Sequence, residues 1–490
     1  MQRLGDLGAT ILEFVREPIL GGAWFDGRGF WLNHIFDDRF VVVYALPLAL
    51  ILLLLRDPIR LRVGIVLTGI VFLTYILGAA YAAFWLLVCV GFYFASEKYA
   101  AALHRSNRAP SASERGFNAH PALFAGGLIV AWWIGSESLK RILLPGDLAD
   151  WLWTNARWVY PLGRRGFEFE AEFLLPHTNQ PFPAIFWNTH NIGAAYLTMR
   201  MLHYFIELKR GTIPTQRRSL LNFLAYLCYA PNLIQGPIER YARFQDEIDT
   251  CPQRRSWDNL GPALGRISWG IAKGVIATLY FLPTVADYLM GPQIYYKHPE
   301  RIGSYAFLYF GVYIHIFWLY LEFSGYCDVS AGIARLLGYR QVENFNWPWL
   351  ATSLRDFWRR WHISLSSLLR DYLYIPLGGN RRHVTLNLII TFALCGIWHS
   401  LRFDLAVWGA VMGGMLAVNQ VWAHWMARID AGPDRPMQRI RRGWLRLAPL
   451  PQICAWVITM HFFVHSLLIF FGGQGVQRVY WELIRRPLGL

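Results

Sequence analysis

Long apolar stretches alternate with short, basic connections along most of this chain. Val63–Phe94 contains no charged residue, and Val41–Leu55 is interrupted only by a tyrosine and a proline. A helix of about 20 apolar residues crosses a bilayer, so such stretches predict membrane spans. Val63–Phe94 fits one long span or two short ones joined at a glycine. The other apolar stretches are Ala122–Ile134, Ile185–Met201, Leu220–Ile234, Leu264–Met290, Tyr305–Leu321, Val384–Trp398, Leu405–Met426 and Ile453–Phe471. The pattern predicts an all-α, polytopic integral membrane protein with about 10–12 transmembrane helices.

Composition supports a membrane protein. Of the 490 residues, 55% are hydrophobic and only 16% are charged, and the mean hydropathy is +0.27. The formal net charge of +15 gathers in connections such as Arg56–Arg62, Lys209–Arg218 and Arg428–Arg446. Basic residues beside spans mark the cytoplasmic side and attract anionic lipids. Lipid and topology therefore explain the charge without nucleic acid, and we expect a multi-pass protein of the cell (inner) membrane. Arg478, Arg485 and Arg486 also follow the last apolar run, so its topology stays open.

The first forty residues lack the compact basic and apolar pattern of a removable signal. Ile11, Leu12, Val15 and Ile19 recur at helical spacing, which favours an interfacial amphipathic helix, with a mobile tail as the alternative. The six cysteines form no CxxC or CxxH pattern. We therefore predict neither a disulfide framework nor a metal site.

One polar segment, "FWRRWHISLSSLLRDYLYIPLGGNRR" at 357–382, interrupts the apolar pattern. From Ser364 onward its large side chains share one helical stripe, which predicts an amphipathic helix rather than a span. Pro376 followed by Gly378 and Gly379 predicts a turn that ends this helix. Either the segment lies at the interface with its arginines reaching headgroups, or it has a function. The residues of the stripe are Leu365, Leu368, Leu369, Tyr372 and Ile375.

A histidine at the end of an apolar run favours the functional interpretation. "TLNLIITFALCGIWHS" ends in His399 and Ser400, and a titratable group at membrane depth is costly and is therefore a functional candidate. Histidine suits proton transfer because its unperturbed pKa is about 6.5. His362 and His399 lie about 37 residues apart and each follows a tryptophan. We predict that they share a polar cavity, although either one alone could be a structural hydrogen-bonding group.

Two further side chains near these segments need an explanation. Cys395 lies one helical turn before His399, so a Cys–His acyl-enzyme is conceivable, but a small packed residue is the favoured reading. Asp328 lies in the apolar stretch "YCDVSAG". An isolated buried carboxylate is too costly, so we expect Asp328 to pair with a cation.

Several motifs in a fixed order identify a family resemblance. "SGYCDVSAGIARLLGY", "NFNWPW", "FWRRWHISLSSLLRDYLYIPLGGN" and "CGIWHS", together with "CYAPNLIQGPIERYARF" at 228–244, resemble the membrane-bound O-acyltransferase family. The likeness covers about residues 185–420 and is greatest to the bacterial branch that acetylates alginate and transfers D-alanine to teichoic acids. It implies a central funnel surrounded by tilted spans and short re-entrant or interfacial helices.

The resemblance also implies roles for individual residues. His399 matches the signature histidine and would be the general base that activates an acceptor hydroxyl. His362 would orient the acceptor or stabilise the oxyanion. Asn346, Trp358, Arg359 and Asp371 are candidates for the substrate-binding wall of the cavity, with a structural role as the alternative for each. The implied division is an N-terminal transmembrane region at 1–184 with a long ordered loop near 144–183, a catalytic core at 185–426, and a basic loop with the final span at 427–490.

The implied reaction moves an acyl group from a cytoplasmic thioester to a hydroxyl, and acetyl is the acyl group that we expect. Acetyl-CoA or an acyl carrier would be the donor, with no permanently bound cofactor. Arginines at the entrance would meet the donor's phosphates, or else lipid headgroups. The acceptor would be a cell-surface polysaccharide or an extracytoplasmic protein that relays the group to it. The arginines considered for the entrance are Arg359, Arg360, Arg381 and Arg382.

Two alternative functions remain at this point. One is acylation of a protein or lipid, and the other is a channel or transporter that uses the histidines as a proton relay. The sequence also departs from the family pattern, with Ser400 in place of a glycine and Met412 where a third histidine is common. "IFWNTHNIGAAYLTMRMLHYFIE" is mildly similar to the eukaryotic protein-acylating branch. These departures leave the acceptor open.

Overall fold

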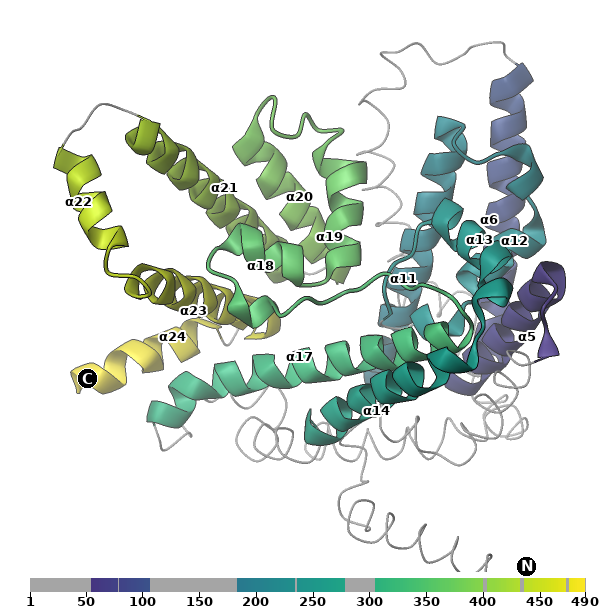
Figure 1. Cartoon of the computed structure of the whole chain (residues 1–490), viewed down its shortest axis with the longest axis horizontal. Coiled ribbons are helices and arrows are strands. Elements are labelled where there is room, and N and C mark those ends of the chain that lie inside the picture. Colours follow the sequence, from purple (N-terminus) through teal and green to yellow (C-terminus); the bar gives the residue numbers. More distant parts are fainter. Residues whose placement is uncertain are drawn as a thin grey trace, which may run out of the picture.

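A computed structural model describes residues 54–77, 79–105, 183–233, 236–277, 305–399, 403–431, 436–472 and 476–489. Within these ranges all regular secondary structure is helical (Figure 1). Short turns of other helix types are η4 (Ala230–Asn232), η9 (Pro348–Leu350) and the π-helical turn η10 (Arg370–Tyr374). The main helices are α5 (Pro58–Leu77), α6 (Ala79–Arg105), α11 (Pro183–Arg210), α12 (Leu220–Leu227), α13 (Tyr241–Thr250), α14 (Leu260–Ile276), α17 (Tyr305–Leu336), α18 (Leu354–Arg360), α19 (Ile363–Leu369), α20 (Val384–His399), α21 (Phe403–Ala431), α22 (Pro436–Leu445), α23 (Leu450–Gly472) and α24 (Val476–Arg485).

The predicted spans compare with these helices as follows. The apolar stretch 63–94 falls on two helices, since α5 ends at Leu77 and α6 begins at Ala79. By length and composition, Phe403–Ala431 and Leu450–Phe470 qualify as membrane spans among the described residues, and Val384–His399 is a shorter apolar helix. The predicted count of about 10–12 spans stays a prediction. The amphipathic helix near 11–19, the run 122–134 and the loop near 144–183 lie outside the described residues.

The predicted span at Leu220–Ile234 is wrong. Its helix, α12, has 8 residues, and at about 1.5 Å per residue it is too short to cross a bilayer. Phe223 and Leu227 are fully buried against α5 and α6 rather than facing lipid. This run is apolar because it fills a protein core.

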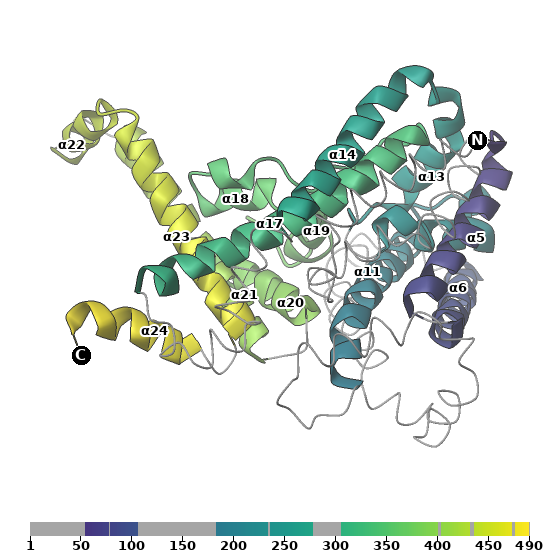
Figure 2. The same cartoon turned by 90° about the horizontal axis from the view of Figure 1, so that it is seen from below.

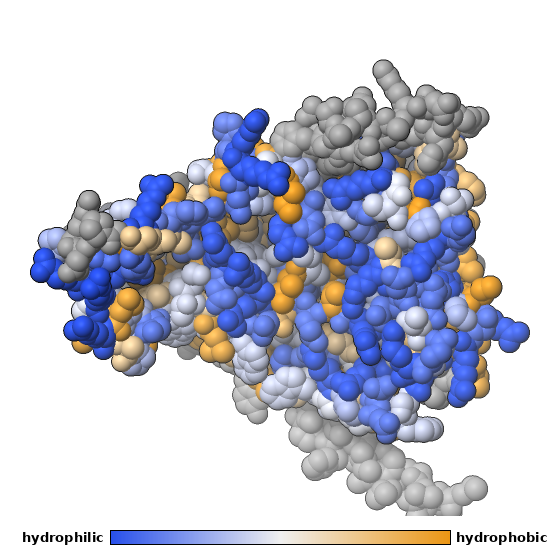
Figure 3. All heavy atoms as spheres, turned by 45° about the horizontal axis from the view of Figure 1, so that its top comes forward, coloured by the Kyte–Doolittle hydropathy of each residue, from blue (hydrophilic) through white to orange (hydrophobic). Residues whose placement is uncertain are grey.

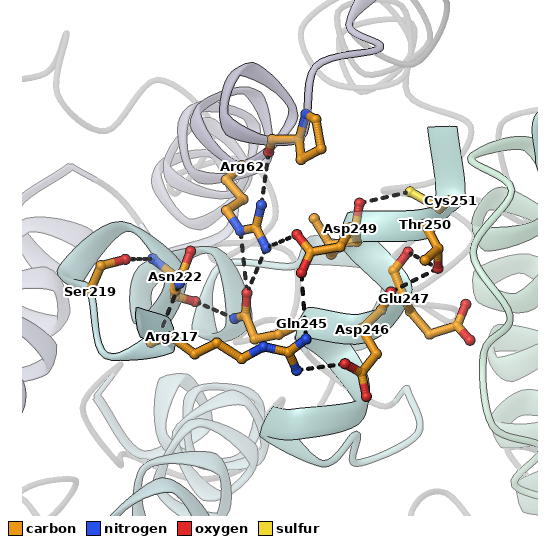
Figure 4. A network of polar contacts seen from close by, with 12 residues as sticks. Arg62, Arg217, Ser219, Asn222, Gln245, Asp246, Glu247, Asp249, Thr250 and Cys251 are labelled. Carbon is orange, nitrogen blue, oxygen red and sulfur yellow. Dashed lines mark hydrogen bonds and ion pairs between the residues drawn. The ribbon is translucent and has the colours of Figure 1, made fainter. Parts of the chain in front are cut away.

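Polar contacts fix α5, α12 and α13 to one another (Figure 4). The Arg62 guanidinium of α5 donates to Gln245 Oε1 at 3.0 Å and pairs with Asp249 at 2.5 Å, both on α13. Gln245 in turn donates to the Asn222 carbonyl of α12 at 3.0 Å. Arg62 is 6% exposed, so the network supplies a buried cation with both a countercharge and hydrogen bonds.

Closely packed antiparallel helix pairs form the other half of the molecule. α20 and α21 approach so closely that a Cβ on Gly396 would lie 1.9 Å from the Leu405 carbonyl oxygen, and one on Gly409 would lie 1.9 Å from that of Phe392. Small residues permit such backbone approach between membrane helices. α14 and α17 lie side by side in the same way (Figure 2), with Gly270 against the Gly325 carbonyl. These contacts leave no room for added atoms.

The surface shows where polar side chains collect. In Figure 3 hydrophilic residues gather around α12 and α13 and again on α22 at the opposite end. α22 carries basic residues, including Arg439 and Arg442, beside the exposed Ile440 and Trp444. Such a basic amphipathic helix suits the membrane interface.

A buried ion cluster joins α14 to α17. Asp328 is 6% exposed and pairs with Arg266 Nε at 2.6 Å and with Lys273 Nζ at 2.5 Å. The expectation that Asp328 has a cationic partner is confirmed. Arg266 also pairs with Glu343 at 2.6 Å.

We expect Asp328→Asn to destabilise the protein by about 3 kcal/mol, because it leaves Lys273 as an uncompensated cation that is largely buried. The thermal unfolding midpoint in detergent measures the effect. Asp258→Asn, an exposed site before α14, is the matched control and should change the midpoint little. Equal midpoints for the two variants would contradict the assigned role of the ion cluster.

Candidate active site

His362 lies between α18 and α19 in a strained backbone conformation. Its φ is 44°, in the left-handed region, and its residue is 3% exposed. Non-glycine residues in this region cost about 1–3 kcal/mol and cluster at functional sites. Backbone hydrogen bonds hold both sides of it, with Ile363 N donating to Asn344 O at 3.0 Å and Asn346 N donating to Arg360 O at 2.9 Å. The fold therefore maintains a costly conformation to place this ring.

The His362 ring is fixed by two polar side chains. Asn344 Oδ1 accepts from the Ser364 amide at 3.2 Å and lies 3.3 Å from His362 Nδ1. Because that oxygen can only accept, His362 Nδ1 carries the proton and Nε2 of the neutral ring has the lone pair. The Tyr196 hydroxyl of α11 lies 3.3 Å from Nε2 and therefore donates to it. The ring is thus held in one tautomer with its basic nitrogen toward Tyr196.

Asn344 is itself anchored by the extended segment 339–346. Val342 N donates to Glu239 Oε1 at 3.0 Å, and Arg243 binds the same carboxylate. Glu239 lies in the connection before α13 and is buried, which raises the pKa of its carboxyl above the ordinary value. The backbone that carries Asn344 is therefore held in place by hydrogen bonding to Glu239.

His399 ends α20 and lies beside three aromatic rings, with part of the residue exposed. Its ring centroid lies 4.7 Å from that of Trp398, 5.0 Å from that of Phe470 and 6.1 Å from that of Trp408. The start of α20 is fixed by Asn387, which donates to the carbonyls of Gly379 and Arg382 at 3.1 and 2.6 Å. The predicted turn at Gly378 and Gly379 thus exists and anchors the helix that carries His399.

One cavity of about 270 Å³ contains both histidines. Trp398 connects them, since its ring lies 6.3 Å from that of His362 and 4.7 Å from that of His399. The cavity lies at the boundary between the core around α18, α21 and α23 and the core around α11, α19 and α20. The predicted shared cavity was expected to be polar, but its wall is mostly aromatic and aliphatic. Its lining also includes Tyr196, Leu319, Phe323, Trp358, Trp361, Leu365, Trp408, Phe463, Leu467 and Phe470.

The other predicted site residues divide into two groups. Trp358 lines the cavity. Asn346 and Arg359 are exposed and do not line the cavity. Arg359 follows Trp358 directly on α18, so the two side chains point in different directions. Asp371 pairs with Arg240 at 2.5 Å and with Arg370 at 2.7 Å. The Asp371 carboxylate therefore joins η10 to the start of α13. The lining of this cavity does not include these three residues, and their predicted substrate-binding role stays a prediction.

Two of the functional neighbours were missed in the sequence. "NFNWPW" contains two asparagines, and only the fold shows that Asn344 rather than Asn346 reaches His362. Tyr196 lies within an apolar run that carries no signal of its own. Cys395 is 1% exposed and packs in the core around α19 and α20, outside the lining of the cavity. This placement favours its packing role.

The amphipathic stripe of the polar segment is nearly as predicted. Leu365, Leu368, Leu369 and Tyr372 are buried, but Ile375 is 57% exposed. The π-helical turn Arg370–Tyr374 inserts extra backbone per turn and moves Ile375 off the buried face.

We expect Asn344→Ala to lower the turnover number of the reaction at this site by about tenfold to a hundredfold, because small displacements of an orienting group are costly in rate. Asn344→Asp keeps an acceptor for His362 Nδ1 and should recover part of the activity, which a purely structural role would not predict. Asn346→Ala is the matched control and should resemble the wild type. A loss of activity equal in Asn344→Asp and Asn344→Ala would contradict the positioning role.

The fold and site together define a helical protein with two histidines in one mostly apolar cavity. The sequence profile of the membrane-bound O-acyltransferase family matches residues 75–462. The chain therefore belongs to that family, and the predicted resemblance and enzyme class are confirmed.

Several curated relatives share this family. The chain is 35% identical over 273 residues to a probable alginate O-acetylase of Azotobacter vinelandii, covering 54% of this chain and 50% of the relative. It is 32% identical over 361 residues to a peptidoglycan O-acetyltransferase of Helicobacter pylori, covering 66% and 63%. It is 26% identical over 297 residues to a teichoic acid D-alanyltransferase of Bacillus subtilis, covering 57% and 68%. The chain thus spans about half to two thirds of the length of these relatives.

Proposed function

We propose that this protein transfers a short acyl group, acetyl in the first instance, from a cytoplasmic thioester to a hydroxyl of a cell-envelope polymer or of a partner that relays it. The observation that carries the proposal is that His362, at the junction of α18 and α19, and His399, at the end of α20, line the same cavity. The three relatives described above are named for alginate, peptidoglycan and teichoic acid, all of which are polymers that carry hydroxyls. The protein would act as a multi-pass enzyme of the inner membrane.

The roles of the two histidines follow from their surroundings. His399 removes the proton from the acceptor hydroxyl while its oxygen attacks the thioester carbonyl. The tetrahedral intermediate then expels the thiolate, the C–S bond breaks, and the protonated His399 returns the proton to sulfur. The neutral His362 ring has no N–H at Nε2, which accepts from the Tyr196 hydroxyl. It therefore suits orienting an acceptor hydroxyl that takes the place of Tyr196 better than donating to an oxyanion.

The size of the cavity supports a short acyl group. Its volume of about 270 Å³ is near the lower end of ligand pockets, which run from about 300 to 1,000 Å³. An acetyl group with the reacting ends of donor and acceptor suits this space better than a long acyl chain. Once donor and acceptor fill the cavity, its mostly aromatic wall would limit the access of water to the thioester. The cavity volume therefore favours transfer of a short acyl group over transfer of a long fatty chain.

The experiment uses membranes that contain the full chain, supplied with isotope-labelled acetyl-CoA or with an acetylated carrier protein. Alginate-type, peptidoglycan and teichoic acid polymers and the proteins of the cell envelope are offered as acceptors, and mass spectrometry measures the label in each. We expect label in at least one polymer or envelope protein only when the chain is present. Absence of label with every donor and acceptor, in membranes shown to contain folded protein, would overturn the proposal.

A further inference from the structure

A second cavity, away from the two histidines, lies where α14 begins and α17 ends. Its volume is about 600 Å³, well within the range of ligand pockets. Four arginines and a single carboxylate, Glu343, line it, together with neutral polar and small residues. The arginines are Arg254, Arg266, Arg335 and Arg340.

Two of these arginines are already neutralised. Arg254 pairs with Glu247 and donates to the Gly338 carbonyl at 2.9 Å. Arg266 pairs with Asp328 at 2.6 Å and with Glu343 at 2.6 Å. The sole carboxylate of the lining is therefore occupied within the protein.

Arg335 and Arg340 have no carboxylate partner among the residues that the structure describes. Both are exposed toward the cavity mouth. The lining residues and the groups joined to them through ion pairs, Glu247, Asp328 and Lys273, together comprise five cations and three carboxylates. This cluster, which we call the basic pocket, thus has an excess of two positive charges in a concave site. Exposed arginines on a flat surface would be satisfied by water, whereas here they border a half-open, concave site of about 600 Å³.

The end of α17 does not oppose an anion in the basic pocket. Carbonyl groups at a helix C-terminus carry partial negative charge. Here the Leu337 and Gly338 carbonyls accept from Arg255 at 3.1 Å and Arg254 at 2.9 Å. Two guanidinium groups therefore donate to these carbonyls. The charge available to a ligand is the positive charge of Arg335 and Arg340.

We propose that the basic pocket binds a phosphate-bearing ligand through Arg335 and Arg340. The guanidinium fork matches two phosphate oxygens at once. The ligand is either the headgroup of an anionic phospholipid or a soluble phosphate ester, since both present the same phosphate oxygens to a basic, concave site. This proposal does not rest on the proposed acyl transfer. Ligand binding to the basic pocket can be measured in protein that shows no acyl transfer.

The pocket and the histidine cavity share one structural support. Arg340, Gln341 and Glu343 of the extended segment 339–346 line the basic pocket, and the next residue, Asn344, holds His362. The phosphate site is therefore built into the same segment that orients the candidate active site.

The test measures binding to the purified full chain in neutral detergent with two probes. Adenosine 3′,5′-bisphosphate represents a soluble phosphate ester, and short-chain phosphatidylglycerol represents the lipid, with phosphatidylcholine as its zwitterionic comparison. We expect one probe to bind, and binding to weaken at least about tenfold in the double variant Arg335→Gln/Arg340→Gln, because two charge-assisted contacts are lost. Whichever probe binds identifies the source of the phosphate.

Two further variants complete the experiment. Arg439→Gln/Arg446→Gln removes the same charge at exposed positions on and after α22, and it should bind like the wild type. Ala331→Phe fills the pocket without a change of charge and should weaken binding even if the double arginine variant does not purify in folded form. Lack of binding of both probes, or unchanged binding in the folded double variant and in Ala331→Phe, would overturn the proposal.

Discussion

Replacing His399 by alanine is expected to lower the rate of acyl transfer by about 10²–10⁴-fold, the usual contribution of a positioned general base. The ring lies in the cavity with His362 and contacts Trp398, Trp408 and Phe470. Removing it leaves the acceptor hydroxyl without a group to take its proton. The measurement is labelled product by mass spectrometry, with protein amount checked in parallel.

His424→Ala is the matched control for this variant. His424 is an exposed histidine on α21 whose Nδ1 lies 2.8 Å from the Gln420 carbonyl oxygen of the same helix. It should retain wild-type activity. His362→Ala should be impaired less than His399→Ala, because an orienting group supplies only part of the rate. Near-normal product from His399→Ala at matched expression would remove it from the mechanism.

A large effect is also expected far from the chemistry, at Gly409. A Cβ at this position would lie 1.9 Å from the Phe392 carbonyl oxygen of α20, so Gly409→Ala must push the two helices apart. Overpacking typically costs about 1–3 kcal/mol and occasionally more, and here the obstacle is backbone that cannot rotate away. We expect a loss of at least about 3 kcal/mol in stability. Displacement of α20 also moves His399, so activity should fall with stability.

Gly414 on the same helix provides the control, since a Cβ there meets nothing within 4 Å. Gly414→Ala should leave stability unchanged or raise it by up to about 1 kcal/mol, the gain in helix propensity. Thermal unfolding in detergent compares the two variants. Similar midpoints would show that the close packing of α20 on α21 is not needed to hold the site.

Much of this arrangement could be predicted from local patterns. The apolar runs predicted α21 and α23, and Pro376 with Gly378 and Gly379 predicted the turn before α20, because these signals depend on neighbours in the sequence. The run at Leu220–Ile234 misled because burial in a protein core and burial in lipid both select apolar residues. Ile375 misled because a π-helical turn changes the helical period without a sequence signature.

The site could be predicted only in part, for a related reason. His362 and His399 were found because polar residues at membrane depth are rare, whereas Tyr196 and Asn344 have ordinary surroundings in the sequence. Their role depends on contacts across 166 and 18 residues of chain. Asp371 is charged and lies near His362 in the sequence, but its carboxylate forms an ion pair with Arg240. Choosing among such residues requires the packing of the helices. The predicted division at 184 and 426 stays a prediction.

A double-mutant cycle on the two histidines tests the central claim most directly. Purified wild type, His399→Ala, His362→Ala and the double variant are compared by the rate of label transfer from the thioester to the polymer, over incubations long enough to record residual turnover. Residues that serve one reaction step are strongly non-additive. If both rings act on the same hydroxyl in the shared cavity, the double variant should be no slower than His399→Ala alone. Rate losses that multiply, so that the double variant is slower than His399→Ala by the full factor of His362→Ala, would contradict a single two-histidine site.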